Sequence, residues 1–414
     1  MTALFIAGIA MTAMGKRPEA SVKSLTAEAV RGALADAGIG ADRIEAAWFS
    51  NTRQPMLEGQ NTIRGQVALR AMGIGAIPVV NVENACASGS TAVIQAAASI
   101  RAGLCSTALV VGAEKMFFPD RPEKIAAAFR GGTDIENIDR IHAELSALAA
   151  DLIPQALKGR EAQARSFFMD SYAAFARLHM KTFGTTRRQL AAVASKNHTH
   201  SALNPLSQYR TPMSVDDVLA DKLIVWPFTR SMCAPISDGA AALVLMAGET
   251  MTPAMRQRAV RLRGFALGSG ADRAPDDFAA HVGARVARAA YEAAGVGPED
   301  VDLAEVHDAT AYSEIQQIEN LGLCPIGQGG PFSEAGQTTL GGRVPVNPSG
   351  GLVSKGHPVG ATGIAQLYEL CLHLRDEAGE RQIPGARIAV AENGGGFLQT
   401  EEAATAVTLL ERPA

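Results

Sequence analysis

One pattern of segments occurs twice in this chain. In the first copy, a stretch with helical spacing ends at Gly38, and a strand-like run then ends at Ser50. Residues 283–310 repeat this order of helix, glycine and strand. Twelve positions separate Gly38 from Ser50, and twelve also separate Gly295 from His307. The chain is therefore expected to be a duplication of one unit of helices and strands.

The duplication extends to a second set of segments. In the first half, the apolar run at 78–82 reads as a buried strand, followed by a cysteine, a helix-like stretch and a strand at 108–114. In the second half, the segment at 347–363 leads into a helix, and a strand follows at 388–392. This alternation predicts an α/β fold with a mostly parallel sheet in each half. We expect the halves to pack about a pseudo-twofold axis.

Short polar or glycine-rich segments directly follow several of the expected strands. Ligands of open α/β sheets bind beyond the carboxyl ends of the strands. We therefore expect these segments to converge on one crevice that forms the functional site. They comprise residues 84–89, 306–310, 347–360 and 392–396.

A region between the halves departs from the repeated pattern. Residues 117–235 are richer in charge and are expected to form helices and loops, whereas the run that follows them returns to an apolar strand. This region is therefore expected to be an insertion that binds the distal part of a substrate. The predicted domains are a first half at 1–116 and 236–255, the insertion at 117–235, and a second half at 256–414.

Charge and cysteine usage exclude several classes of protein. The net charge of −4 and the lack of a basic tract argue against nucleic-acid binding. No apolar run approaches the length of a membrane span, and the N-terminal stretch reads as a first strand rather than a signal peptide. The cysteines have no CxxC spacing and are expected to be reduced thiols of a cytoplasmic protein. They are Cys86, Cys105, Cys233, Cys324 and Cys371.

Cys86 lies between the strand at 78–82 and a helix that begins near Gly89. At such a position, unpaired backbone N–H groups and the positive end of the helix dipole favour a thiolate. Its small neighbours leave room for a substrate, which a core cysteine would not need. We therefore predict that Cys86 is an activated nucleophile. Cys324 lies in a glycine-rich loop, so a place near the crevice stays open for it, whereas the remaining cysteines are expected in the core.

Two histidines are candidates for partners of this nucleophile. His357 lies in a glycine-dense run just before a helix, where it can accept the proton of Cys86. His307 follows an expected strand, and its ring N–H can polarise a thioester carbonyl. Ser354 and Gly356, which adjoin His357, are expected to contact the substrate.

The segment after the last expected strand supplies further candidates. Backbone N–H groups of Asn393, Gly394 and Gly395 can form an oxyanion hole together with the N–H of the nucleophile. Glu392 can act as an acid or base, but Glu114 occupies the corresponding place in the other half. A structural role for Glu392 is therefore equally consistent with the sequence.

The segment NHTH at 197–200 carries two histidines two positions apart. No carboxylate or thiol lies nearby in the sequence to complete a metal site. We therefore expect a surface loop here and no metal site in the chain.

Longer motifs strengthen the interpretation of these residues. In order along the chain they are NACASGS around Cys86, GAEKM, SKNHTHSALNP, SDGAAALVL, EVHDAT and NPSGGLVSKGHPVGATG. The sequence resembles the thiolases, in particular the branch similar to the thiolase part of sterol carrier protein X. The resemblance covers nearly the whole chain, and the motifs are specific when taken together.

This resemblance implies a five-layered αβαβα fold of two duplicated halves, with an inserted loop domain that holds coenzyme A. It implies that Cys86 carries the acyl group, His357 activates it and His307 binds the thioester oxygen. It also implies a homodimer or homotetramer. Coenzyme A or acyl-CoA would be a substrate, with no permanently bound cofactor.

The sequence departs from the family at the second catalytic cysteine. Many thiolases carry it in a Cys-x-Gly motif, where this chain has Glu392-Asn393-Gly394. Another branch carries it in a His-Asp-Cys-Phe motif, where this chain has His307-Asp308-Ala309-Thr310. Abstraction of a proton alpha to a thioester needs a positioned base. That base would be Glu392, His357 or a substrate group, unless the step is skipped.

The favoured function is therefore an acyltransferase that cleaves a 3-ketoacyl-CoA by thiolysis or forms it by Claisen condensation. One alternative is decarboxylative condensation of the ketosynthase type, which generates its enolate without a base. Another is a thiolase-like retro-aldolase, a class often paired with a small OB-fold partner subunit. The last is an acyl-CoA or lipid binder without turnover.

Overall fold

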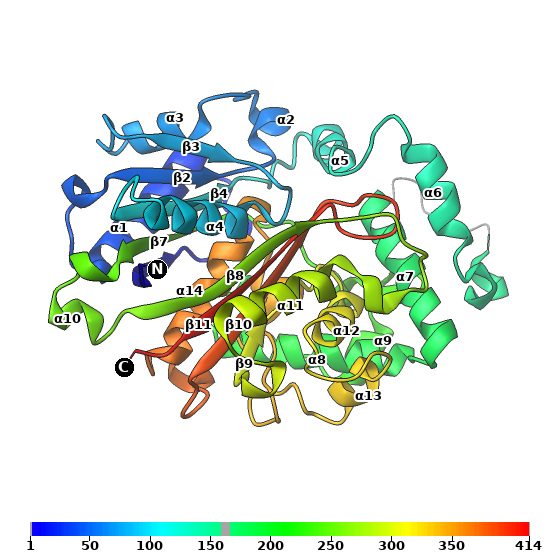
Figure 1. Ribbon diagram of the computed structural model, residues 1–414. Helices are drawn as coiled ribbons and strands as arrows, with labels where there is room; N and C mark the ends of the chain where they lie inside the picture. Colours follow the sequence, from blue (N-terminus) through cyan, green and yellow to red (C-terminus); the bar gives the residue numbers. More distant parts are fainter. Residues whose placement is uncertain (1, 159–165, 414) are drawn as a thin grey trace.

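The computed structural model describes residues 2–158 and 166–413 (Figure 1). Within these residues, one nine-stranded sheet has the order β3-β2-β4-β7-β1-β8-β11-β10-β9, and β5 pairs with β6 in a separate hairpin. The strands are β1 (Leu4–Met11), β2 (Ala46–Ser50), β3 (Val79–Val82), β4 (Thr107–Glu114), β5 (Leu223–Val225), β6 (Phe228–Thr229), β7 (Gly239–Ala247), β8 (Val260–Ser269), β9 (Leu303–Glu305), β10 (Ile388–Gly395) and β11 (Ala404–Glu411).

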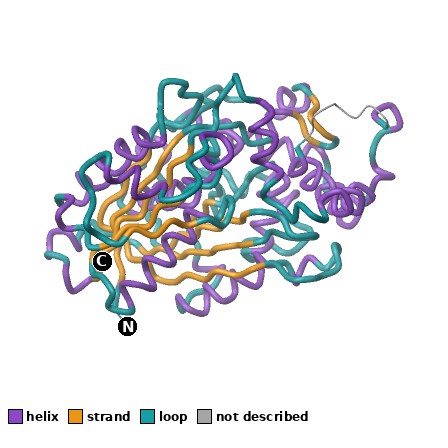
Figure 2. Tube along the Cα trace, turned by 90° about the horizontal axis from the view of Figure 1, so that it is seen from above, coloured by secondary structure: helices purple, strands orange, loops and turns teal. Residues whose placement is uncertain are grey.

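Helices cover both faces of the sheet (Figures 1 and 2). They are α1 (Val22–Ala37), α2 (Gln54–Glu58), α3 (Arg64–Arg70), α4 (Ser88–Arg101), α5 (Pro122–Arg130), α6 (Ile138–Ala147), α7 (Phe167–Phe183), α8 (Arg187–Ala202), α9 (Val215–Ala220), α10 (Pro253–Arg256), α11 (Val282–Ala294), α12 (Ala311–Asn320), α13 (Gly329–Glu334) and α14 (Thr362–Leu374).

The strand order confirms the duplication. The first half runs β3-β2-β4-β7-β1, and the second runs β9-β10-β11-β8. Val346 forms an isolated parallel bridge with Ala304 of β9, at the place that β3 occupies in the first half. The two halves join where β1 pairs with β8, through Leu4 opposite Leu262.

The expectation of a mostly parallel sheet needs a correction. Among the described strands, the pairs β2–β3, β2–β4 and β9–β10 are parallel. Five pairs are antiparallel, namely β1–β7, β1–β8, β4–β7, β8–β11 and β10–β11. Strands β10 and β11 are antiparallel because the connection between them is short. A parallel pair would need a longer crossover connection, which returns the chain to the other end of the sheet.

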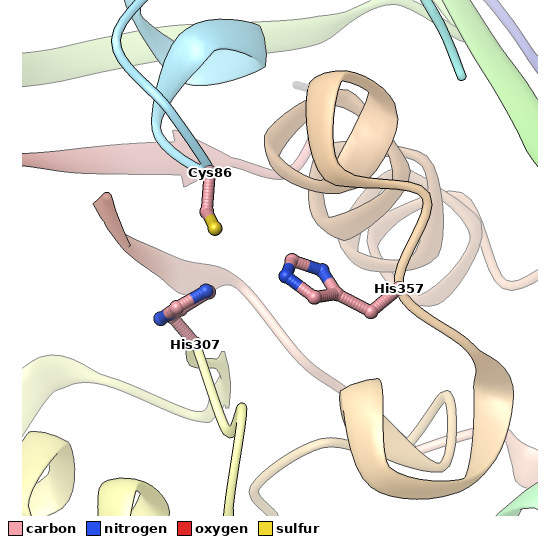
Figure 3. Close-up of side chains that lie close together, drawn as sticks. All are labelled: Cys86, His307 and His357. Atoms are coloured by element: carbon pink, nitrogen blue, oxygen red, sulfur yellow. The ribbon is translucent and has the colours of Figure 1, made fainter. Parts of the chain in front are cut away.

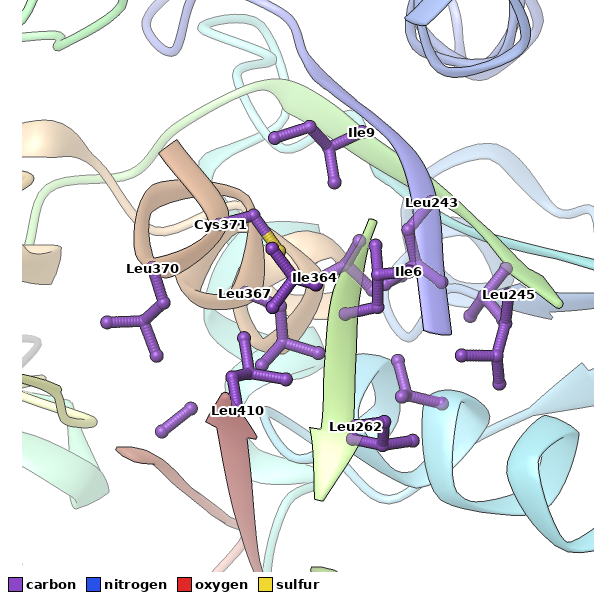
Figure 4. Packing of buried hydrophobic residues seen from close by; sticks show 14 of the residues in the cluster. Ile6, Ile9, Leu243, Leu245, Leu262, Ile364, Leu367, Leu370, Cys371 and Leu410 are labelled. Atoms are coloured by element: carbon purple, nitrogen blue, oxygen red, sulfur yellow. The ribbon is translucent and has the colours of Figure 1, made fainter. Parts of the chain in front are cut away.

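The layers follow the αβαβα order. Helices α4 and α14 pack against each other and against strands of both halves, so they form the middle layer. Their apolar faces share one core with the strands, as Figure 4 shows for Ile364 of α14 beside Ile6. Helix α1 covers the outer face of the first half and α11 that of the second.

Strand β3 is less buried than its apolar sequence suggested. It lies at the edge of the sheet, and Val80 is 40% exposed. Its exposure follows from this edge position, because β3 pairs with β2 alone. The expected first strand near the N-terminus, by contrast, is confirmed as β1.

The chain between β4 and β7 contains helices α5 to α9 and the β5–β6 hairpin. Residues 159–165, inside the expected insertion, lie outside the described residues. The core of these helices includes Phe175 and Leu190, and it continues into Tyr312 and Phe397 of the second half. The insertion therefore packs on the opposite half of the molecule. Its boundaries at 117 and 235 stay a prediction.

Candidate active site

Three of the predicted site residues lie together. The sulfur of Cys86 and one ring nitrogen from each of His307 and His357 are all within 4.8 Å of one another (Figure 3). The centroids of the two imidazole rings are 5.3 Å apart. Each residue lies in a connection beside β3, β9 or α14, at the crevice where the strand ends were expected to converge.

Cys86 sits on a tight turn between β3 and α4. Ala85 has a positive φ of 47°, a conformation that costs a non-glycine residue about 1–2 kcal/mol. The hydroxyl of Ser88 stabilises this turn, because it accepts a hydrogen bond from Asn84 N at 2.7 Å and donates one to Ala85 O at 2.6 Å. The turn places the thiol ahead of the first turn of α4.

The resting state of Cys86 differs from the expected thiolate. Burial raises the pKa of the thiol to about 11, and the negative charges of Glu114 and Glu83 act in the same direction. Arg53 and a hydrogen bond from the backbone of Gly396 lower the pKa by less. The expectation of a thiolate considered the helix dipole but not the free-energy cost of removing water from the anion. At Cys86 this desolvation cost outweighs the stabilisation of the thiolate by the helix dipole. A base must therefore remove the thiol proton when the nucleophile reacts.

His357 has the geometry of that base. Its Nδ1 lies 2.7 Å from Oγ1 of Thr362, and the Thr362 hydroxyl donates to Pro358 O at 3.1 Å. Because the hydroxyl proton is used in that bond, Nδ1 is the protonated ring nitrogen and Nε2 has the free lone pair. Burial, followed by the neighbouring His307, holds the pKa of His357 well below its usual value. The ring is therefore neutral and able to accept a proton.

His307 is a buried imidazole whose ring makes no hydrogen bond to the described residues. Among the described residues, neither of its ring nitrogens has a hydrogen-bond partner, although the side chain is 1% exposed. Burial lowers the pKa of His307 to about 4, so the ring is neutral and has one N–H. An unsatisfied buried polar group costs about 1–3 kcal/mol. Such a group in a site next to a nucleophile is suited to bind a ligand oxygen.

Known proteins resemble this chain over most of its length. Residues 4–222 match the family description "Thiolase, N-terminal domain", and residues 270–409 match "Thiolase C-terminal domain-like". The chain belongs to the thiolase family. The resemblance noted in the sequence is thereby confirmed, together with the α/β fold class of two duplicated halves.

Three relatives illustrate the range of the family. Sterol carrier protein 2 from Bos taurus is 36% identical over 405 residues, which cover 95% of this chain and 70% of the relative. An acetyl-CoA acetyltransferase from Methanothermobacter thermautotrophicus is 36% identical over 397 residues, which cover 94% of this chain and 96% of the relative. Benzoylsuccinyl-CoA thiolase subunit BbsB from Thauera aromatica is 30% identical over 400 residues, which cover 95% of this chain and 94% of the relative.

A solved structure shares the fold. The Ltp2-ChsH2(DUF35) aldolase superposes with a TM-score of 0.76 at 24% identity, over 99% of this chain and 98% of that one. Within the described residues of our thiolase-family protein, no helix combines the length and apolar character needed to cross a membrane.

Glu392 lies outside the cluster of three in this thiolase-family site. Its Oε2 accepts a hydrogen bond from the backbone N–H of His307 at 3.0 Å, and Oε1 has no partner among the described residues. Burial, followed by the charge of Glu402, holds the pKa of Glu392 well above its usual value, so the carboxyl is protonated. This arrangement favours a positioning role over an acid-base role.

The other half provides an internal comparison for Glu392. Glu114, at the corresponding end of β4, accepts hydrogen bonds from the backbone N–H groups of Thr52, Arg53 and Gly360. Both glutamates therefore hold the loop that follows a neighbouring strand. The symmetry of the duplication explains why a carboxyl recurs at this place.

Substitution of Glu392 separates the two roles. Glu392→Gln keeps an acceptor for the His307 N–H and mimics a protonated carboxyl, so we expect activity within a few-fold of the parent. Glu392→Ala leaves that buried N–H unpaired and is expected to cost about 1–3 kcal/mol of stability. Thermal unfolding and kcat/KM of both variants check this. A loss of activity in Glu392→Gln at unchanged stability would instead identify Glu392 as the acid or base.

The glycines after Glu392 let two segments approach closely. Gly394 and Gly395 belong to β10 itself, and a side chain at Gly395 would collide with the backbone of Asn84 and Ala87. Asn393 accepts a hydrogen bond from the hydroxyl of Ser90 at 3.0 Å, which ties β10 to α4. The backbone of Gly396 donates a hydrogen bond to the sulfur of Cys86. An oxyanion hole formed by Asn393, Gly394 and Gly395 stays a prediction.

Two other expected site residues do not line the cavity at Cys86. The Ser354 hydroxyl is 3.0 Å from Nδ1 of His198 on α8, so it links the insertion to the second half. Gly356 has a φ of +120° and packs against Ser237 and Met14. Neither Ser354 nor Gly356 lines the cavity. Their contact with substrate stays a prediction.

The expectation of a surface loop at the NHTH segment is wrong. Both histidines lie on α8 and are buried, with His198 4% exposed and His200 3% exposed. Nδ1 of His200 lies 3.0 Å from Asn347 O, and Nε2 of His198 lies 3.1 Å from Ser231 O. The segment therefore packs the insertion against the second half. Cys324, whose place the sequence left open, is buried in the core of the second half.

A cavity of about 600 Å³ opens beside Cys86 and His357. Its walls are mainly apolar and come from α5, the start of α7 and the chain at 234–236. The sequence analysis missed these wall residues, because their aromatic and aliphatic side chains are indistinguishable from core residues in a sequence. It also missed Arg53, although Arg53 follows β2, and a search of every strand end would have found it. The missed wall residues include Met116, Phe129, Phe167, Phe168 and Tyr172.

Proposed function

We propose that this thiolase-family protein is an acyltransferase that moves an acyl group between Cys86 and coenzyme A. The observation that carries the proposal is the cluster of the Cys86 sulfur and the two imidazoles within 4.8 Å, beside a cavity. The family relationship supports it, since two of the relatives are named as an acetyl-CoA acetyltransferase and a benzoylsuccinyl-CoA thiolase subunit. Acyl-CoA enters as a substrate.

The first half of the reaction transfers the acyl group to the enzyme. Nε2 of His357 takes the thiol proton while the sulfur attacks the keto carbon of a 3-ketoacyl-CoA. The negative charge that develops on the keto oxygen accepts a hydrogen bond from the ring N–H of His307. Collapse of this intermediate breaks the carbon–carbon bond and leaves an acyl group on Cys86.

One histidine suffices to balance the protons of thiolysis. The imidazolium of His357 returns its proton to the enolate carbon of the departing acetyl-CoA. In the second half, neutral His357 takes the proton of the coenzyme A thiol, whose sulfur attacks the acyl-enzyme. The same proton then returns to the sulfur of Cys86 as the shortened acyl-CoA leaves. This scheme places no acid-base step on Ala309 or Glu392, the two positions where other thiolases carry a cysteine.

Decarboxylative condensation is the second candidate. The observation that favours it is the Cys-His-His set itself: Ala309 supplies no further base, and the carboxyl of Glu392 is engaged by the backbone N–H of His307. Loss of carbon dioxide from a malonyl thioester generates an enolate without removal of an alpha proton. The acylation of Cys86 is the same in both candidates.

Product analysis distinguishes these functions. The protein is incubated with a 3-ketoacyl-CoA and coenzyme A, or with an acyl-CoA and malonyl-CoA, and the CoA esters are separated by liquid chromatography and mass spectrometry. We expect a shortened acyl-CoA and acetyl-CoA in the first mixture. Product and carbon dioxide only in the second mixture would select decarboxylative condensation. In a third mixture, which contains a hydroxyacyl-CoA alone, a ketone or aldehyde product unaffected by Cys86→Ala would select a retro-aldolase. Binding without product in all three mixtures would select a carrier.

We further propose a homodimer or homotetramer in the cytoplasm. The cysteines of the described residues are all free, which suits a reducing compartment. The fold neighbour is named as a complex with a DUF35 component, which supports a small partner subunit for this chain as well. Light scattering after size-exclusion chromatography measures the assembly, with and without co-expressed small partners.

A further inference from the structure

The cluster at Cys86 combines three side chains that bind soft and borderline metal ions. It contains one thiol and two imidazoles, which are the ligand types of zinc sites in proteins. Histidine, cysteine, aspartate and glutamate are the common metal ligands. In the described part of the chain, these three side chains are the group of such residues whose ligand atoms all lie within 4.8 Å of one another. Figure 3 shows the three side chains pointing toward a common space.

The distances fit a zinc ion after a small contraction. Three atoms with mutual separations of at most 4.8 Å lie no more than 4.8 Å divided by √3, about 2.8 Å, from a common centre. Zinc bonds are about 2.3 Å to sulfur and 2.0–2.1 Å to imidazole nitrogen. Each ligand atom would therefore move by less than about 1 Å, a shift within reach of side-chain rotation.

The hydrogen bonds of the histidines leave their ligand atoms available. Neither ring nitrogen of His307 has a partner among the described residues, although the side chain is almost fully buried. His357 is held through Nδ1 by Thr362, so its Nε2 faces the cluster. Histidine ligands of zinc are commonly oriented in this way by a bond to the other ring nitrogen. The cavity beside Cys86 leaves room for a water as the fourth ligand.

We propose that Cys86, His307 and His357 form a reversible inhibitory site for Zn²⁺. On binding, a zinc–sulfur bond forms, the thiol proton passes to solvent, and one or more waters leave the hydrated ion. The sulfur lone pair is then held by the metal and cannot attack a carbonyl. Because the site depends on the geometry of the cluster alone, it does not depend on which acyl reaction the protein performs.

The test uses Zn²⁺ on the whole protein, with Co²⁺ as a spectroscopic probe. We expect one Zn²⁺ per chain by calorimetry, a sulfur-to-cobalt charge-transfer band with Co²⁺, and protection of Cys86 from iodoacetamide that a chelator reverses. Cys86→Ala should remove the band. His307→Ala should weaken binding by more than about 100-fold, since loss of an outer-sphere partner alone costs about 10- to 100-fold. Thr362→Val should weaken zinc binding by that smaller factor of about 10- to 100-fold, because it removes an outer-sphere partner of His357 and no ligand.

His142→Ala is the matched control. His142 lies on α6, where its side chain is 41% exposed and pairs with Asp170 at 3.0 Å. We expect this variant to bind Zn²⁺ like the parent. Zinc binding that is lost in His142→Ala but kept in His307→Ala would overturn the proposal. Unchanged alkylation of Cys86 by iodoacetamide in the parent at saturating Zn²⁺ would also overturn the proposal. This measurement needs no variant, so misfolding of a variant cannot explain its result. A protein that binds Zn²⁺ as expected but shows no thiolysis when free of zinc would instead contradict the proposed function.

Discussion

Replacement of Cys86 by alanine is expected to lower the rate of acyl transfer about 10⁴-fold or more, the order of effect seen when a catalytic nucleophile is removed. The physical reason is that, among the described residues, Cys86 is the cysteine whose sulfur clusters with the two imidazoles of His307 and His357. The side chain of Cys86 is partly exposed to the cavity, and its removal leaves the turn at Ala85 unchanged. Thermal stability should therefore stay close to that of the parent.

Cys105→Ala is the matched control for that loss. Cys105 lies just before β4, at the opposite end of the strand from the site, and is 7% exposed. We expect it to keep its activity and to lose some stability, since its side chain packs in the core of the middle layer. Full activity in Cys86→Ala, measured as kcat/KM for thiolysis, would exclude a covalent mechanism through this residue.

Replacement of His357 by glutamine is expected to lower acyl transfer by about 10²- to 10⁴-fold, the range for a general base. Glutamine can keep the contact with Thr362 but has no basic nitrogen. Thr362→Val keeps the imidazole but removes the hydroxyl that selects its tautomer, so its loss should be smaller. Equal losses in the two variants would indicate that His357 acts through packing rather than as a base.

The pH dependence of the parent tests the same assignment. Burial lowers the pKa of His357, so the ring stays neutral as the pH falls from 8 to 6, through the usual pKa of a histidine. The pKa of the Cys86 thiol is raised to about 11, so the thiol stays protonated in this range. We therefore expect the rate of Cys86 acylation to be nearly constant from pH 6 to 8. A tenfold rise per pH unit would indicate a free thiolate instead.

The sequence was sufficient to predict the duplication and the meeting of the three side chains. The equal spacing from Gly38 to Ser50 and from Gly295 to His307 reflects the same helix, turn and strand in both halves. Because strand ends meet at one edge of a sheet, the positions of Cys86 and His307 after strands implied their proximity. These inferences needed only local pattern and topology.

Other features depend on packing that a sequence pattern does not contain. The pKa of Cys86 depends on how much protein surrounds the sulfur, and burial there outweighs the helix dipole. The walls of the cavity, such as Phe168 and Tyr172, come from helices whose docking on the second half was not predictable from periodicity. The expected loop at His200 is instead part of α8, where His200 and Asn197 bond to buried groups of the second half.

The most direct measurement of the central proposal is the mass of the peptide that contains Cys86 after a rapid quench with an acyl-CoA. The proposal predicts a mass increase equal to the acyl group on that peptide, removed by later addition of coenzyme A and absent in Cys86→Ala. A protein that turns over acyl-CoA under these conditions while the peptide keeps its unmodified mass would contradict the account.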